Sequence, residues 1–247
     1  MNAPVPGTIP YFLQEQLREL IIDGTFRPGQ PLREQELEKR FATSRGPIRE
    51  ALRLLEVRGL VSHVPRRGFR VKLYSDREIR DHYMLRAELE AFAIQQLAEC
   101  TDLAPLLAEL ERCHDDLAEA RASGDARRYL RDIRAFYAAI STYTGNAPLC
   151  EVLVKLNETI EPLRYNMVSR KLGESESLKY TRYIIDALAA RRFDDAARAK
   201  RTHVLSNLPK IIGAYADASY EGGEKAGPKT KDRASLASKA PVVVHTG

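Results

Sequence analysis

The sequence predicts a mainly α-helical protein in two parts, an N-terminal winged helix-turn-helix followed by an all-α antiparallel helical bundle. The first part is predicted by three short helical patterns and by two β-prone segments within residues 60–73 that flank a glycine. The second part is predicted by apolar residues that keep a helical spacing after Tyr74. The breaks between these later helices are short, which is typical of antiparallel neighbours.

The first two helices are predicted from apolar spacing and turn residues. Leucine and isoleucine at i, i+4, i+7 and i+8 predict an amphipathic helix over about residues 11–23. Gly24 suits the left-handed cap that ends it, and Phe26-Arg27-Pro28-Gly29 is typical of a turn. A short helix over about residues 34–41 follows.

The third helix carries a face of arginines. Ser44 is its predicted N-cap, and Pro47 falls in the first turn, where a missing N–H costs little. Successive side chains are rotated by about 100° around the helix axis, so the apolar stripe lies within about 60° of Ile48 when Ile48 is set at 0°. Three arginines then lie beside this stripe at about 60°, 100° and 140°, namely Arg45, Arg49 and Arg53.

A β-hairpin is predicted after this helix. The segment Pro65-Arg66-Arg67-Gly68 separates the β-prone residues 60–64 and 69–73. The hairpin therefore has two arginines and a glycine at its tip, as expected for the wing of a winged helix.

The remaining chain predicts six helices, over about residues 76–100, 102–122, 126–143, 148–169, 175–191 and 193–215. The predicted organisation is a flexible N-terminus (1–8), a winged helix-turn-helix (9–73), an all-helical domain (76–217) and a disordered basic tail (221–247).

Charge and cysteine usage limit the function classes. Residues 1–70 contain 12 Lys and Arg against 8 Asp and Glu, whereas residues 71–221 contain 22 against 24. A basic first part favours a phosphate-bearing partner. The three cysteines are widely spaced and form no C-x-x-C pair, which favours free thiols in a reducing cytoplasm. No signal peptide or membrane-spanning run is predicted, so no membrane partner is expected.

The arginine helix suits the DNA major groove, because an arginine can bond guanine O6 and N7 together. Ser44 and the free N–H groups at the helix start suit a phosphate. The alternative for each arginine is a solvated helix face, with Arg49 paired to Glu50 or Glu56.

Two further places suit the DNA backbone and the minor groove. Arg33, just before the second helix, is placed to bind a backbone phosphate. At the wing tip, Arg66 or Arg67 can lie against the minor groove, and Gly68 lets the backbone approach closely.

These residues closely resemble the winged helix of GntR-type regulators. The resemblance is carried by Ile21-x-Asp23-Gly24-x-Phe26-x-Pro28-Gly29-x-x-Leu32, by Ser44-Arg45-x-Pro47-Ile48-Arg49-Glu50-Ala51-Leu52 and by Gly59-Leu60-Val61. The helical part resembles the FCD ligand-sensing domain of the FadR subfamily. This second resemblance rests on Leu85-Arg86-x-x-Leu89-Glu90, Asp132-x-x-x-Phe136-Tyr137-x-x-Ile140 and Thr144-Gly145-Asn146. With six predicted helices rather than seven, the helical part resembles the vanillate-regulator branch of this subfamily.

The resemblance also implies a divalent metal, which many members hold with one Asp and three His. The corresponding positions here are Ile133, Tyr137, about Thr181, and His203. Only His203 matches. Asp132 lies one residue out of register, about 100° around its helix, and does not substitute. A tight site needs several N or O ligands, so we expect no cofactor, with the family's metal site lost or weak.

The effector site is expected around Arg86, which matches a position where family members clamp an acidic effector. The alternative is an ion pair of Arg86 with Glu88 or Glu90. Tyr137 and His203 are expected to face the same cavity; the alternative for both is an ordinary place in the core.

These observations predict a cytoplasmic homodimer that binds a pseudo-palindromic operator in double-stranded DNA, more often as a repressor, under the control of a small organic-acid effector. A catalytic helical domain is disfavoured, because the sequence contains no nucleophile elbow, Walker loop, G-x-G-x-x-G or intact metal cluster. A ligand-independent regulator with a degenerate pocket is the open alternative. A thermal-shift screen of organic acids separates it from a sensor, because a bound ligand stabilises only the sensor.

Overall fold

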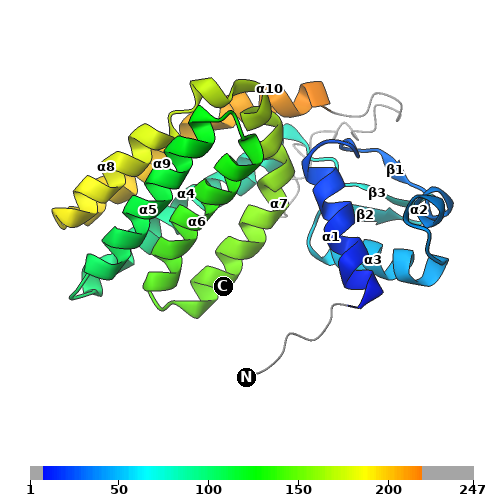
Figure 1. Ribbon diagram of the computed structural model, residues 1–247, viewed down its shortest axis with the longest axis horizontal. Coiled ribbons are helices and arrows are strands. Elements are labelled where there is room, and N and C mark those ends of the chain that lie inside the picture. Colours follow the sequence, from blue (N-terminus) through cyan, green and yellow to red (C-terminus); the bar gives the residue numbers. More distant parts are fainter. Residues whose placement is uncertain (1–7, 219–247) are drawn as a thin grey trace, which may run out of the picture.

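The computed structural model describes residues 8–218. Figure 1 shows two parts, a small N-terminal domain with a sheet and a larger bundle of helices. The predicted fold class is confirmed. The predicted flexible N-terminus (1–8) lies outside the described residues apart from Thr8, and the predicted basic tail (221–247) lies wholly outside them. Among residues 8–218, no helix combines the length and apolar character that crossing a membrane requires.

The N-terminal domain contains three helices, α1 (Ile9–Ile22), α2 (Glu34–Phe41) and α3 (Arg45–Val57). Helix α3 buries the predicted apolar stripe, which consists of Ile48, Ala51, Leu52 and Leu55. These side chains pack with apolar residues of α1, including Leu13 and Leu17, in one core. The exposed side of α3 is therefore the side that carries the arginines.

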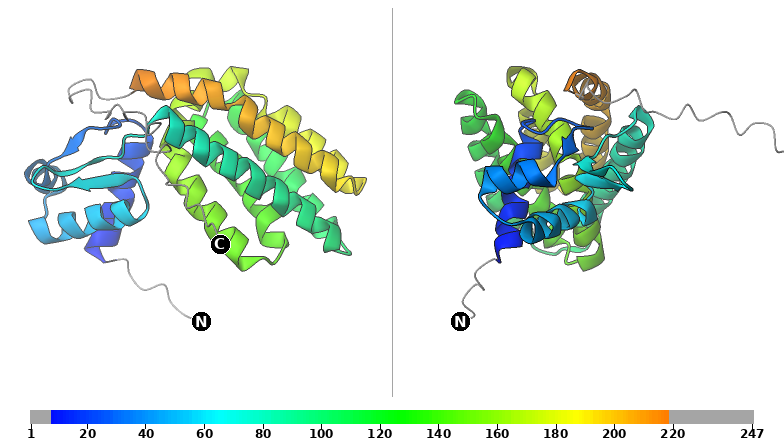
Figure 2. Two further views of the ribbon diagram at one scale, coloured as in Figure 1. Left: turned by 180° about the vertical axis from the view of Figure 1, so that it is seen from behind. Right: turned by 90° about the vertical axis from the view of Figure 1, so that its right-hand side faces the viewer.

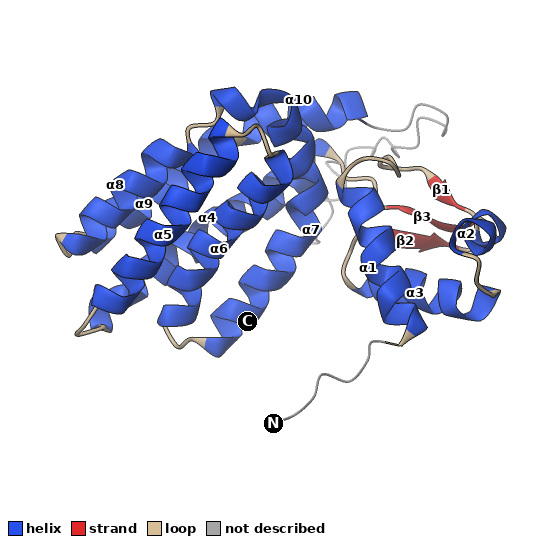
Figure 3. Ribbon diagram, viewed as in Figure 1, coloured by secondary structure: helices blue, strands red, loops and turns tan. Residues whose placement is uncertain are grey.

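A three-stranded antiparallel sheet closes this core (Figure 3). Strands β2 (Val61–Val64) and β3 (Gly68–Val71) form the predicted hairpin, with Val61 opposite Val71. The first strand, β1 (Pro31–Leu32), pairs with β3 and was not predicted. Two residues are too few to show the period-2 alternation that identifies a strand.

The second part contains seven α-helices within the described residues. They are α4 (Asp76–Gln96), α5 (Ala104–Ala122), α6 (Ala126–Tyr143), α7 (Ala147–Lys171), α8 (Ser177–Ala189), α9 (Phe193–Ser206) and α10 (Leu208–Ala218), with 3-10 turns at Leu97–Glu99 and Leu172–Glu174.

The expectation of six helices is wrong at one place. The predicted last helix, over about residues 193–215, is divided at Asn207 into α9 and α10. Pro209 explains the division, because proline lacks an N–H and its ring clashes with the carbonyl four residues earlier. The Asn207 side-chain amide donates to the His203 carbonyl at 2.9 Å and completes the end of α9.

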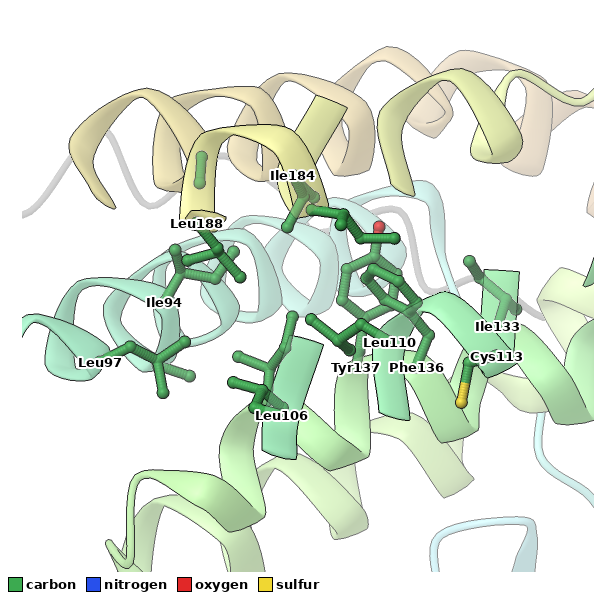
Figure 4. Close-up of a cluster of buried hydrophobic side chains, with 14 of the residues drawn as sticks. Ile94, Leu97, Leu106, Leu110, Cys113, Ile133, Phe136, Tyr137, Ile184 and Leu188 are labelled. Atoms are coloured by element: carbon green, nitrogen blue, oxygen red, sulfur yellow. The ribbon is translucent and has the colours of Figure 1, made fainter. Parts of the chain in front are cut away.

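The main core of the bundle lies between α4, α5, α6 and α8. Figure 4 shows Ile94, Leu110, Phe136 and Leu188 of these helices turned toward one another. The same packing holds Tyr137 next to Phe136, with the two rings 5.1 Å apart at an angle of 76°. This core therefore fixes the position of α6, which lines the candidate ligand site.

Helix α7 lies between the bundle and the N-terminal domain (Figure 1). Arg18 of α1 forms an ion pair with Glu161 of α7, and Arg134 of α6 donates to the same carboxylate at 2.8 Å. The Thr159 hydroxyl donates to the Lys155 carbonyl within α7 at 2.9 Å and lies 3.4 Å from the Arg58 carbonyl. Helix α7 thus holds the N-terminal domain against the bundle, together with Arg127 of α6, which pairs with Asp23 at the end of α1 at 2.6 Å.

The linker after β3 is also anchored to both parts. The Tyr74 hydroxyl donates to the Gly59 carbonyl at 2.7 Å, and the Tyr74 N–H donates to the Tyr215 hydroxyl at 3.0 Å. Tyr215 in turn donates to the Lys72 carbonyl at 3.3 Å. These bonds connect the base of the wing to α10.

Candidate functional site

The N-terminal end of α3 is exposed and carries the predicted arginine face. Within the described residues, the N-cap Ser44 makes no side-chain capping bond, which leaves its hydroxyl and the first N–H groups of α3 available for a phosphate. The side chains of Arg45 and Arg49 are 68% and 49% exposed. Pro47 is the third residue of the helix, where its missing N–H leaves no hydrogen bond unmade.

Glu34 of α2 holds two of these arginines in place. Its carboxylate forms an ion pair with Arg45 and lies 3.7 Å from the Arg49 Nε. The expected alternative partners of Arg49, Glu50 and Glu56, are not the ones found. Because the Glu34 side chain is largely buried, it restricts the rotamers of both arginines while leaving their outer faces in solvent.

The wing carries the other predicted residues at its tip. Arg66 and Arg67 are exposed in the turn between β2 and β3. Arg66 has a φ of +64°, a left-handed conformation that costs a non-glycine residue about 1–2 kcal/mol. Gly68 has a φ of +78°, and a Cβ there would meet no atom within 4 Å in the described structure. Glycine is thus needed for the turn, while the open space leaves room for a partner's approach.

Arg33 lies at the start of α2 as its N-cap residue. Its guanidinium donates to Glu36 at 3.0 Å, and both side chains remain mostly exposed. In Figure 1, α2, the start of α3 and the wing tip lie at the end of the molecule that points away from the bundle. The structure therefore brings all eight predicted DNA-contacting residues to one end of the N-terminal domain.

The three predicted effector residues also come together. Arg86 of α4, Tyr137 of α6 and His203 of α9 are buried around one small cavity in the bundle. The cavity has a volume of about 30 Å³. Water-sized cavities in proteins are of this order, so the site is closed around its own side chains.

Glu90 lies between two cations at the centre of this site. Arg86 donates to Glu90 Oε1 at 3.1 Å, and Lys200 Nζ lies 2.7 Å from Glu90 Oε2. The ion pair of Arg86 with Glu90, proposed above as the alternative to effector binding, is therefore present. Burial opposes ionisation of Glu90, but Arg86 and Lys200 outweigh it and lower the pKa of Glu90 to about 2.

Lys200 is fully buried, which is unusual for a lysine. Its Nζ lies 2.9 Å from the centre of the Tyr137 ring, in cation–π contact. Burial lowers the pKa of Lys200 well below its usual value, although Glu90 acts in the opposite direction. The Lys200 amine thus occupies the space between α6 and α9.

His203 is held as a neutral imidazole. Its ring stacks on Tyr180 at 4.5 Å, and Nε2 lies 3.3 Å from the Ser177 hydroxyl. Burial, together with the nearby Lys200 and Arg86, lowers the pKa of His203 well below its usual value. Within the described residues its Nδ1 has no hydrogen-bond partner, so one ring nitrogen stays available to a ligand.

The residues at the family's metal positions do not fit a divalent cation. Ile133 offers no donor, the Tyr137 ring is covered by Lys200, and the Thr181 hydroxyl is bonded to His114 Nδ1 at 2.8 Å. No group of three His, Cys, Asp or Glu in the described residues is arranged to hold a metal. Asp132 lies beside Arg128 and Arg131, 3.5 and 2.9 Å from their Nε atoms.

A larger cleft of about 580 Å³ lies on the other side of Tyr137 and Glu90. It runs between α6 and α7 and is bounded by Arg18 of α1 and by Arg58. Its volume is in the range of small-molecule pockets. The cleft therefore contacts both domains, whereas the closed cavity lies inside the bundle.

Sequence reasoning missed three charged residues that the structure places at these sites. Glu34 gave no signal, because its partners lie eleven and fifteen residues away in α3. Lys200 could have been found, since it falls on the buried stripe of α9 with Ala196 and His203. Arg164 could have been found in the same way, since it follows the buried Ile160 by four residues in α7.

A winged helix-turn-helix joined to a helical domain with a polar cavity defines a class, the two-domain transcriptional regulators. The models of two families match the chain: the gntR family of bacterial regulatory proteins at residues 12–71, and the FCD domain at residues 81–206. The chain belongs to the GntR family of transcriptional regulators and has an FCD domain, as in the FadR subfamily.

Curated relatives agree with this assignment. The HTH-type transcriptional repressor GlaR of Escherichia coli is 30% identical over 213 residues, which are 81% of this chain and 94% of the relative. The HTH-type transcriptional regulator YdhC of Bacillus subtilis is 32% identical over 61% of this chain and 68% of its own length. These relatives are transcriptional regulators, which confirms the prediction that the chain is not an enzyme.

Solved structures share the fold. A GntR transcriptional regulator from Rhodococcus sp. RHA1 has a TM-score of 0.70 and 25% identity, covering 85% of this chain and all of its own. Escherichia coli McbR/YncC has the same TM-score and coverage at 22% identity. The arrangement of helices and wing is therefore that of known members.

The neutral His203 predicts a pH dependence of stability. Its folded pKa lies below that of the unfolded chain, so between pH 7 and pH 5 the unfolded state takes up a proton that the folded state does not. The free energy of unfolding should fall over this range. We expect His203→Gln to reduce the fall, as measured by urea denaturation at both pH values. An equal fall in both proteins would show that His203 titrates normally in the folded state.

Proposed function

We propose that this protein is a dimeric, cytoplasmic DNA-binding repressor that recognises a pseudo-palindromic operator and responds to a carboxylate effector. The observation that carries the DNA-binding part is the exposed N-terminal end of α3, with Arg45 and Arg49 held by Glu34 and with Arg66 and Arg67 at the neighbouring wing tip. Preoriented guanidinium groups suit guanine O6 and N7 in the major groove. The names of relatives such as the repressor GlaR support regulation by repression.

The DNA-binding proposal predicts the effect of Arg49→Ala. The operator is first selected by the wild-type protein from a pool of random duplexes. Affinity is then measured by fluorescence anisotropy at a fixed salt concentration, because phosphate contacts make affinity depend on salt. The variant should lose about 1–3 kcal/mol of operator binding and less of its binding to unrelated duplex.

Arg112→Ala is the matched control, since Arg112 is an exposed arginine on α5 of the bundle. It should bind the operator as the wild type does. Unchanged operator binding by Arg49→Ala would contradict the assignment of α3 as the recognition helix.

The dimer is proposed to form through the outer face of α4. Leu85 and Phe92 lie seven residues apart on one side of this helix and are 49% and 45% exposed, although both are large and apolar. Leu205 of α9 is exposed as well, and Arg201 of α9 pairs with Glu88 between Leu85 and Phe92 at 2.7 Å. Figure 2 shows α4 beside α9 and α10 on the face opposite that of Figure 1. An apolar strip with a polar rim is typical of an interface between subunits.

The proposed interface predicts that Leu85→Glu with Phe92→Glu gives a monomer, because four introduced carboxylates per dimer would be buried together. Sedimentation velocity at micromolar concentration measures this. Tyr183→Glu, at an exposed aromatic residue of α8, should remain a dimer. A monomeric wild type, or a doubly substituted protein that still dimerises, would contradict the proposal.

The effector is proposed to bind where Arg86, Tyr137 and His203 meet. Burial of polar groups without partners supports a ligand at this place, since such groups are costly unless something bonds them. The closed cavity of about 30 Å³ favours the alternative, a regulator that needs no ligand. The two hypotheses, a sensor and a regulator that needs no ligand, differ in whether an added organic acid stabilises the protein.

A further inference from the structure

The buried site holds more positive than negative charge. Two guanidinium groups, of Arg86 and Arg164, and the amine of Lys200 face one carboxylate, that of Glu90. Glu90 is bonded to Arg86 and lies against Lys200. Among residues 8–218, the half-buried Arg164 makes no hydrogen bond and no ion pair. Glu161, which acts on it at longer range, is already paired with Arg18 and Arg134. A desolvated charge without a counter-charge is costly.

The walls of the cavity also present hydrogen-bonding groups that nothing in the described structure satisfies. They are the hydroxyls of Tyr83 and Tyr137 and the Nδ1 of His203. All three residues are more than nine-tenths buried. Burial, followed by repulsion from Arg86, lowers the pKa of Arg164, as expected for two cations that share an enclosed space. A ligand with several oxygen atoms would satisfy these groups together.

We propose that this site binds a dianion, with one negative charge near Arg86 and Lys200 and the other on Arg164. The ligand class is a dicarboxylate or a phosphate monoester. The inference rests on the proposed function, in which the helical domain binds an acidic effector, and it adds the ligand's charge and its second anchor. Since Glu90 balances only one of the three cations Arg86, Lys200 and Arg164, a monoanion would leave one of them without a counter-charge. The two arginines stay charged at any physiological pH.

Helix α7 is the wall that such a ligand has to move. The present cavity has room for little more than a water molecule, and α7 supplies Arg164, Met167 and Val168 to it. Pro162 interrupts the hydrogen bonds of α7 next to these residues, because it cannot donate to the Glu158 carbonyl. A bend there would displace Arg164 with little loss of backbone bonding.

The same stretch of α7 contacts the DNA-binding domain. Glu161 pairs with Arg18, and Glu158 lies 3.9 Å from Arg58, both within two turns of Arg164. A dianion drawn to Arg164 therefore acts on the helix that holds the winged domain, which gives the effector a direct route to the operator-binding surface.

The test is isothermal titration calorimetry of the full chain at pH 8 with two matched pairs of probes. Succinate is compared with monomethyl succinate, and methyl phosphate with dimethyl phosphate. Each pair differs by one negative charge at similar size. We expect at least one dianion to bind about tenfold or more tightly than its monoanionic partner, as for a charge-assisted hydrogen bond. The pair that shows the preference distinguishes a dicarboxylate from a phosphate monoester.

Arg164→Gln should abolish this preference, and Arg170→Gln should keep it. Arg170 is an exposed arginine of the same helix that pairs with Asp217 outside the site. Arg164→Lys retains the charge without the planar fork and should show an intermediate preference. It serves in place of Arg164→Gln if circular dichroism shows that the latter is unfolded.

Two results would overturn the inference while leaving an acidic effector in place. One is equal binding of monoanions and dianions by the wild type, and the other is a dianion preference that survives in Arg164→Gln or is undiminished in Arg164→Lys. Failure of all four probes to bind the wild type would count against the inference and against the proposed effector together.

Discussion

The ion pair between Arg18 of α1 and Glu161 of α7 is the contact on which the relation between the two domains depends. Both side chains are mostly buried, at 11% and 15% exposure, and loss of either one would leave the other paired only with more exposed side chains, Glu15 and Glu19 for Arg18 or Arg134 for Glu161. Arg134 shares the Glu161 carboxylate, so three helices meet at one charged group. Together with the hydrogen bond of Tyr74 to Tyr215, the contact holds the arginine helix and the wing against the bundle.

Helix α7 is shared by the two functional regions. Glu158 and Glu161 face the DNA-binding domain, and Arg164 lies one turn further on, at the buried polar site. Two sites that act on one element can bias its position reciprocally, which is the physical requirement for allosteric control. The Lys200 amine contacts Tyr137 and Glu90 at the buried polar site.

The sequence was sufficient for features that depend on local spacing. The arginine face of α3, the wing with Gly68 and the convergence of Arg86, Tyr137 and His203 all follow from helical or strand periodicity and from the resemblance to the family. Ion pairs between elements that are far apart in the sequence could not be predicted in this way. Arg18 and Glu161 lie 143 residues apart, and no local pattern indicates that they meet. The division at Asn207 is different, because the sequence shows Pro209. The apolar periodicity continues on both sides of this proline, so one continuous helix was predicted.

The most direct test of the coupling through α7 is a double-mutant cycle of Arg18→Gln and Glu161→Gln, with the free energy of unfolding measured by urea denaturation. Residues in direct contact within one network typically show an interaction energy of about 0.5–3 kcal/mol. We predict a coupling in this range, with the double variant less destabilised than the sum of the single variants. Additive effects, within about 0.5 kcal/mol, would contradict the account, because the winged domain would then not be held to the bundle by this pair.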